Sequence, residues 1–258
     1  MAQVLAPYEI PLMRQSCQLA AQVLVFIEDS IQPGVSTQKL DELCHDFILS
    51  HKAVPAPLNY NGFPKSICVS VNSCICHGVP DKAILKEGDI VNVDVTCIKE
   101  GFYGDTSKTF FVGEVSQTAK DLTDCAYQAM HKGIEAIRPN GTTGDIGFAI
   151  ERYSTRKGFF PVREIGGHGI GKKFHEDPFV PSYGKKGRGE VLQPWSCITV
   201  EPMINQNSSD IKEFDIPNSS VKYYHTVDDS LSAQFEHTIL IQGENSEKPY
   251  EILTLPPS

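Results

Sequence analysis

The sequence predicts an α+β fold made of two related halves, in which each half has two helices followed by β-strands. Apolar residues recur at helical spacing in two stretches near the start of the chain and in two more beyond its middle. Runs typical of β-strands follow each pair of helices. At 258 residues the chain can bury a large core, either as one domain or as two small ones.

The first half begins with a predicted helix over residues 11–31, whose apolar stripe stops at Gln-Pro-Gly. Ser36 or Thr37 is placed to cap a second helix, which runs to about residue 50. Strand-like runs follow at 66–71, 89–98 and 107–113. The segment "KEGF" (99–102) is a turn signal between the last two runs, so we expect them to form a hairpin.

The second half repeats this order. Helices are predicted over 120–137 and 142–157. Residues 31–40 align without gaps on residues 137–146, an offset of 106, and residues 84–94 align on residues 191–201, an offset of 107. Two independent segments with nearly the same offset indicate an internal duplication.

The charge of the chain disfavours several kinds of partner. The formal net charge is −9, and the nearest basic run, Lys185, Lys186 and Arg188, is short and typical of a solvated loop. We therefore expect neither nucleic-acid binding nor attachment to an anionic membrane. No apolar run approaches the roughly 20 residues that span a bilayer, and no basic segment followed by an apolar one marks a signal peptide.

The eight cysteines are scattered through mostly apolar surroundings and include no CxxC pair. A free buried cysteine packs as a small hydrophobic residue. We therefore expect reduced thiols and a cytoplasmic protein, without disulfides or a thiolate zinc site.

Four carboxylates take symmetric places in the two halves. The alignment puts Asp94 opposite Glu201, and each has a later acidic partner, Asp105 and Glu236. One acid within a strand is most simply a hydrogen-bonded structural residue, but four held close together cannot all stay ionised without a cation. Asn92 and Asp94 share one face of their strand, whereas a shared face for Asp94 and Asp105 depends on whether a bulge intervenes.

The glycine-rich segment "GHGIGKKFHEDP" (167–178) reads as a loop with three possible roles. A phosphate cradle is disfavoured, because prolines follow it and no Gly-Lys-Ser/Thr is present. The segment alone leaves open a structural glycine turn with two hydrogen-bonded histidines. Beside the four acids, His168 is better interpreted as a nitrogen ligand, and His175 or His77 as a group that polarises a substrate carbonyl. Such a site suits Mn, Fe(II), Co or Zn, and two such ions can drive a hydrolysis.

Six motifs together resemble the type I methionine aminopeptidases of peptidase family M24: "CHGVPD", "DIVNVDVT", "FYGDTSKTFFVG", "GHGIGKKFHEDP", "TVEPM" and "SAQFEHTIL". The resemblance runs from about residue 8 to residue 254. It implies the pita-bread fold, an α+β architecture with two pseudo-symmetric ααββ halves (about 8–113 and 117–254) around a central antiparallel sheet. Residues 1–258 would then form a single catalytic domain.

The resemblance also implies roles for individual residues. Two divalent ions (Co, Mn, Fe(II) or Zn) would be held by Asp94, Asp105, His168, Glu201 and Glu236, with Asp105 and Glu236 bridging them. Glu201 would also shuttle a proton, and His77 and His175 would contact the substrate amide as catalytic residues. One Na⁺ or K⁺ ion would bind mainly backbone oxygens of Asn72, Cys74 and Ser232.

A methionine pocket is implied by an aromatic and sulfur-containing set: Tyr60, Phe63, Cys68 and Phe174. Such a wall suits a flexible thioether, although without the resemblance plain core packing explains these residues better. The chain departs from the family at the pocket rim, where Pro57 stands in place of a small residue. The only tryptophan, Trp195, precedes Glu201, so Tyr223 or Tyr224 would replace the usual rim tryptophan. Residues 205–229 form a longer connection than in compact members.

The function implied is metal-dependent removal of the initiator methionine from nascent proteins with a small second residue, by water activated at a dinuclear centre. The enzyme would be a cytoplasmic monomer that associates transiently with the ribosome. A proline-specific peptidase shares the ligands but carries an N-terminal domain, for which residues 1–60 leave no room. A metal-free binding protein of this fold is disfavoured, because all five ligands are present.

Overall fold

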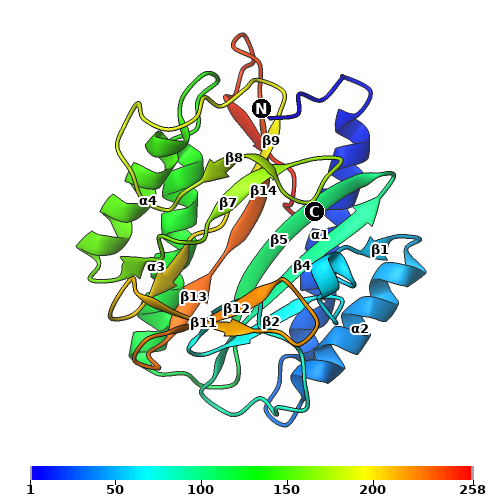
Figure 1. Ribbon diagram of the computed structural model, residues 1–258, viewed down its shortest axis with the longest axis vertical. Helices are drawn as coiled ribbons and strands as arrows, with labels where there is room; N and C mark the ends of the chain where they lie inside the picture. The colour runs from blue at the N-terminus through cyan, green and yellow to red at the C-terminus, as the bar shows by residue number, and fades with distance from the viewer. Residues whose placement is uncertain (1, 257–258) are drawn as a thin grey trace.

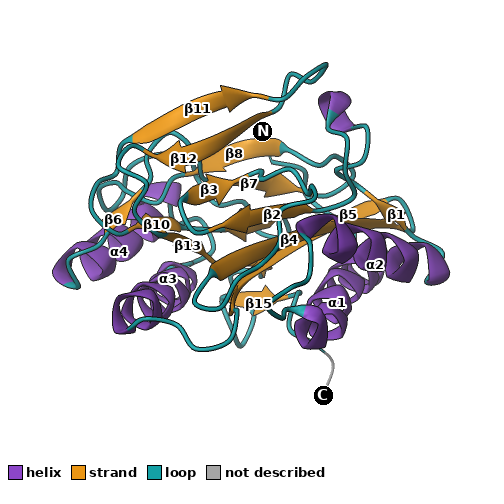
Figure 2. Cartoon of the chain, turned by 90° about the horizontal axis from the view of Figure 1, so that it is seen from below, coloured by secondary structure: helices purple, strands orange, loops and turns teal. Residues whose placement is uncertain are grey.

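A computed structural model describes residues 2–256 and places four helices on one face of a curved antiparallel sheet (Figures 1 and 2). All four predicted helices are confirmed: α1 (Ile10–Ile27), α2 (Thr37–Ser50), α3 (Gln117–Glu135) and α4 (Thr143–Arg156). Two short 3-10 helices cover Glu28–Ser30 and Tyr60–Gly62. Ser36 caps α2 by accepting a hydrogen bond from the Lys39 N–H, and Thr142 forms a capping box with Asp145 at the start of α4.

The central sheet contains strands from both halves. Its order is β1 (Val54–Pro55), β4 (Ile90–Lys99), β5 (Phe102–Phe111), β14 (Glu236–Ile241), β9 (Cys197–Val200), β7 (Gly167–Ile170) and β8 (Glu176–Val180). β2 (Cys68–Val71) also pairs with β4, and β15 (Tyr250–Ile252) with β14. A small sheet joins β13 (Ser232–Gln234), β10 (Met203–Asn205) and β6 (Phe160–Pro161), and another joins β11 (Ile211–Asp215), β12 (Lys222–Thr226) and β3 (Cys74–Cys76).

The two halves have matching parts. In the first half α1 packs on the β4–β5 hairpin, and in the second α3 packs on β13, β10 and β9. Isolated bridges join Ser36 to Ile84 and Thr142 to Val191, at positions that the two aligned segments relate. Each half has its own large apolar core, one around Val23 and Val93 and the other around Leu122 and Ile198.

Residues 10–30 form one helical stretch of 21 residues with a mean hydropathy of 1.2, which is long and apolar enough to cross a membrane. The expectation that no apolar run approaches this length was therefore wrong. Half of the stretch is buried, and α1 lies against β4 and β5 (Figure 2). Its composition is that of a helix that packs one face into a protein core.

Three segments differ from the sequence-based expectation. β5 begins at Phe102 rather than at residue 107, after a two-residue turn in which Glu100 and Gly101 both have positive φ. The segment 167–178 is not a loop but the paired strands β7 and β8 with their connection. A Cβ on Gly167 would lie 2.3 Å from the Thr199 carbonyl oxygen, so its glycine allows strands to approach closely. The long connection 205–229 contains the β11–β12 hairpin, which lies on the side of the sheet away from the helices (Figure 2).

The cysteines agree with the expectation of reduced thiols. All eight are free and buried.

Candidate active site

The first two acids lie on the β4–β5 hairpin. Asp94 pairs with Ser107, and Asp105 pairs with Thr96 two positions further along the same ladder. Because side chains alternate along a strand and the ladder is regular between these pairs, Asp94 and Asp105 project from the same face. No bulge is needed to bring them together.

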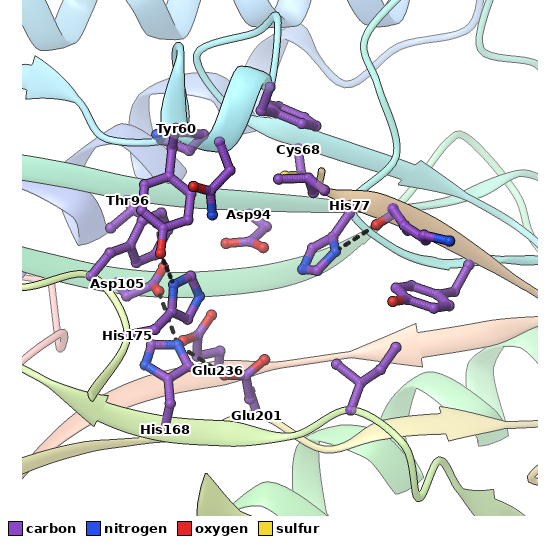
Figure 3. Close-up of a pocket in the computed structure, with 18 of the residues that line it drawn as sticks. Tyr60, Cys68, His77, Asp94, Thr96, Asp105, His168, His175, Glu201 and Glu236 are labelled. Carbon is purple, nitrogen blue, oxygen red and sulfur yellow. Dashed lines mark hydrogen bonds and ion pairs between the residues drawn. The ribbon is translucent and has the colours of Figure 1, made fainter. Parts of the chain in front are cut away.

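The second half adds its acids and a histidine to the same place. Glu236 begins β14 opposite Ser107, and Glu201 is the first residue after β9. His168 lies on β7, the next strand of the sheet. Figure 3 shows these side chains pointing toward one another across the centre of the site. Asp105, His168 and Glu236 each offer a ligand atom, and these three atoms lie within 4.8 Å of one another.

His168 is oriented as a ligand. Its Nδ1 is 3.0 Å from the Gly169 carbonyl oxygen, and because a carbonyl only accepts, Nδ1 carries the proton. The Nε2 lone pair then faces Asp105 Oδ2 at 3.8 Å and Glu201 Oε1 at 3.5 Å. Glu236 Oε1 is also buried without a hydrogen-bond partner among the described residues. One imidazole nitrogen and several carboxyl oxygens thus lie close together, and this donor set fits a metal cation.

Electrostatics supports the same conclusion. Burial raises the pKa of Asp94 to about 7 and the pKa of Glu201 to about 8. Burial, followed by repulsion from neighbouring carboxylates, holds the pKa values of Asp105 and Glu236 well above their usual range. Burial lowers the pKa of His168 to about 4, so the ring is neutral and able to donate its lone pair. Cations would relieve the repulsion among these acids.

Two threonines position the ligands. Thr96 Oγ1 donates to Asp105 Oδ1 at 2.7 Å. Thr199 Oγ1 donates to Glu201 Oε1 at 2.8 Å and accepts from the His168 backbone N–H at 2.9 Å. The sequence reasoning missed both, although each lies two residues from a candidate ligand and therefore on the same face of its strand.

Two further histidines line the site with defined orientations. His77 Nδ1 donates to the Lys222 carbonyl oxygen at 2.9 Å, so its Nε2 carries a lone pair. His175 Nδ1 lies 2.9 Å from the Tyr60 hydroxyl. Burial lowers the pKa of His77, and burial followed by repulsion from His168 lowers the pKa of His175 to about 3. Both rings are therefore neutral at neutral pH.

The five candidate ligands, Thr96, His77 and His175 line one cavity of about 480 Å³. The predicted methionine-pocket residues Tyr60, Phe63, Cys68 and Phe174 line it too. At the rim, Pro57 and Tyr224 line the cavity, whereas Trp195 lies beside Gly243 outside it. The β11–β12 hairpin adds Glu213 and Lys222 to the wall, and no sequence pattern predicted either residue there.

The residues of the predicted monovalent-cation site also lie near one another. Asn72 has a left-handed φ of 53°, and its carbonyl oxygen accepts the Ser232 N–H at 2.9 Å. Cys74 begins β3, two residues further along the chain.

Comparison with known proteins identifies the family. Residues 11–243 match the model of metallopeptidase family M24. The chain is 49% identical over 245 residues to a methionine aminopeptidase of Rickettsia prowazekii, covering 95% of this chain and 92% of that protein. A crystal structure of methionine aminopeptidase from that organism superposes with a TM-score of 0.94 at 46% identity, covering 99% of this chain and all of that one. A prolidase from Pyrococcus horikoshii shares the fold at 21% identity with a TM-score of 0.74, and the match covers 98% of this chain but 64% of the prolidase. The chain has the pita-bread fold and belongs to metallopeptidase family M24, among the bacterial methionine aminopeptidases.

Proposed function

We propose that this methionine aminopeptidase removes the initiator methionine from nascent proteins whose second residue is small, with two divalent ions in the site. The observation that carries the proposal is the His168 Nε2 lone pair, which faces Asp105 and Glu201 oxygens in a site where Glu236 Oε1 is buried without a hydrogen-bond partner among the described residues. Acids held this close cannot all stay ionised without a cation, and metal ions can satisfy such a donor set.

Five residues would hold the ions: Asp94, Asp105, His168, Glu201 and Glu236. When bound, the ions would supply Lewis-acid activation of water and of the substrate carbonyl. The oxygen-rich donor set with one imidazole suits Mn, Fe(II), Co or Zn.

Glu201 is the proposed proton carrier. Its carboxylate would take a proton from the attacking water and deliver it to the leaving amine. Thr199 and Gln234 donate to its two oxygens at 2.8 Å and 3.3 Å, which fixes the plane of the carboxylate. A positioned acid or base of this kind contributes about 10²–10⁴-fold to a rate.

The position of the ring proton predicts a different role for each of the other two histidines. His77, with its proton on Nδ1, presents a lone pair that would accept the N–H of the scissile amide. If the Tyr60 hydroxyl donates to His175 Nδ1, then His175 Nε2–H becomes a donor for the developing oxyanion. The two catalytic histidines would therefore bind opposite ends of one peptide group.

Tyr60, Phe63, Cys68 and Phe174 would enclose the methionine side chain. The Tyr60 and Phe174 rings lie 4.9 Å apart between centroids and form an aromatic wall that suits a polarizable thioether. The limit to small second residues is carried over from the family.

We extend the proposal to the cellular setting. The chain would act as a single catalytic domain over 1–258, with pseudo-halves at about 8–113 and 117–254. It would work as a cytoplasmic monomer in transient contact with the ribosome. A Na⁺ or K⁺ ion at the backbone of Asn72, Cys74 and Ser232 would brace the turn before β3.

The test is methionine release from Met-Ala-Ser compared with cleavage of Ala-Pro-Ser, after chelation and after adding back Co²⁺ or Mn²⁺. Metal-dependent cleavage of Met-Ala-Ser alone is the expected result. Cleavage of Ala-Pro-Ser would instead indicate a proline-directed peptidase. Full activity after exhaustive chelation would refute the metal mechanism. Equal release from Met-Ala-Ser and Met-Leu-Ser would refute the limit on the second residue.

A further inference from the structure

A groove of about 650 Å³ runs between α3, α4 and the loop after β8, and its charged lining residues are mostly cationic. The chain as a whole has a formal charge of −9. The groove is lined by one carboxylate, Asp145, and by five cations: Lys132, Arg138, Arg152, Arg156 and Lys186. It shares no lining residue with the active-site cavity.

Glycines bring the basic loop to this place. A Cβ on Gly144 in α4 would lie 2.5 Å from the Lys185 carbonyl oxygen and 2.3 Å from that of Arg188. The loop can therefore lie directly on the first turns of α4 only because Gly144 has no side chain. This packing holds the loop against α4, and Lys186 lines the groove together with Arg152 and Arg156.

Most cations of the groove have no ion-pair partner. Arg152, Arg156 and Lys186 are exposed, and none of them forms an ion pair within residues 2–256. Lys132 pairs with Glu135 at 2.7 Å, and the Arg138 guanidinium donates to the Glu135 and Ile137 carbonyl oxygens. Asp145 accepts from the Thr142 and Gly187 backbone N–H groups and also interacts electrostatically with Lys186. The groove therefore presents a local positive field on an acidic protein.

Aromatic rings lie among these cations. The Phe148 ring has the Arg152 guanidinium carbon 5.8 Å from its centroid and Lys186 Nζ at 5.4 Å. Tyr153, which also lines the groove, carries Lys157 Nζ at 5.9 Å. Guanidinium groups match phosphate oxygens, and the aromatic faces hold the cations beside them. The groove lining has no Leu, Ile, Val, Met or Trp, and a single phenylalanine among five cations offers little apolar surface to insert among lipid chains, which argues against a membrane surface.

From this geometry we propose that the α3–α4 groove binds the phosphodiester backbone of a nucleic acid without reading its sequence. The inference reverses the expectation drawn from net charge, because a binding surface responds to the local field rather than to the sum over the chain. It does not depend on the hydrolytic mechanism, since the groove and the active-site cavity are separate.

The experiment measures binding of the full chain to a fluorescent RNA duplex and to the DNA duplex of the same sequence, between about 50 and 200 mM salt. Contacts from Arg138, Arg152, Arg156 and Lys186 predict a slope of log affinity against log salt of about −3.6. The double variant Arg152→Gln with Arg156→Gln should reduce the slope to about −1.8 and weaken binding by about tenfold or more at low salt. The double variant Lys82→Gln with Lys86→Gln makes the same charge change at exposed positions outside the groove and should bind like the parent.

Binding of either duplex that follows this pattern supports the proposal, and the comparison of RNA with DNA identifies the source of the phosphates. The proposal is overturned if neither duplex binds at low salt, or if both double variants weaken binding equally. It is also overturned if polyglutamate or anionic vesicles bind the groove as well as the duplexes do. Methionine release by the Arg152→Gln, Arg156→Gln variant should be unchanged, which shows that the variant is folded.

Discussion

Replacing Thr199 by valine removes one hydroxyl and keeps the branched shape of a fully buried side chain. The change leaves the His168 backbone N–H without its acceptor and takes one of two donors from the Glu201 carboxylate. A buried donor without a partner costs about 1–3 kcal/mol, so we expect the free energy of unfolding of the metal-free protein to fall by that amount. His168 and Glu201 each lose a hydrogen bond that orients them as candidate metal ligands. Changes to groups that orient metal ligands typically weaken metal binding by about 10–100-fold, which is about 1.4–2.7 kcal/mol.

Urea unfolding of the metal-free protein and calorimetric titration with Mn²⁺ measure the two effects separately. Thr155→Val is the matched control, because Thr155 Oγ1 donates to the Glu151 carbonyl oxygen at an exposed site where water can replace it. We expect this control to stay within about 0.5 kcal/mol of the parent. A Thr199→Val protein that matches the control in both measurements would refute the positioning role of Thr199.

Three further predictions concern the site and the core. Glu201→Ala should lower kcat by about 10²–10⁴-fold while the thermal unfolding transition persists, and near-normal turnover would exclude its role as proton carrier. His175→Ala should lower kcat/KM with both metal ions retained, as metal analysis would show; loss of metal would make His175 a ligand. The free cysteines should react slowly with a thiol reagent in the folded protein at mildly alkaline pH, because burial raises the pKa of, for example, Cys74 to about 11 and reduces its thiolate fraction. All eight should react after denaturation, and rapid labelling of several in the folded state would contradict the burial.

The helices were predictable because their signals are local. The signals are the caps at Ser36 and Thr142 and the apolar stripes at helical spacing, and each depends only on residues within or next to its own helix. The start of β5 was missed, because Gly104 and Asp105 do not belong to the usual residues of a strand. The structure gives a reason for each. A Cβ on Gly104 would lie 2.4 Å from the Cys17 nitrogen in α1, and Asp105 faces the metal site. Local rules thus failed where close packing and chemistry overrode them.

The four acidic candidate ligands could be inferred because the two halves repeat them, so that two weak signals reinforced each other, and His168 followed from its place beside them. The second wall of the cavity had no such support. Glu213, Lys222 and Tyr224 reach it from the β11–β12 hairpin, whose residues are mostly exposed or half-buried and show no alternation of apolar and polar positions. Which side of the cavity such a hairpin covers depends on its pairing with β3, a contact between segments about 150 residues apart, and no local pattern encodes that.

The charged residues show most clearly that local sequence patterns do not reveal which residues lie together in the fold. The basic run at residues 185–188 and the arginines of α4 are separate, unremarkable segments of an acidic chain, and each is typical of a solvated surface. Lys186 joins the arginines of α4 in one positive groove because Gly144 lets the loop lie on the helix. Electrostatic attraction decreases with distance and is screened within about 10 Å, so affinity for a polyanion depends on which charges share a neighbourhood. The net charge does not say where the charges lie. A formal charge of −9 therefore excludes a nucleic-acid partner only if the charges are spread evenly over the surface.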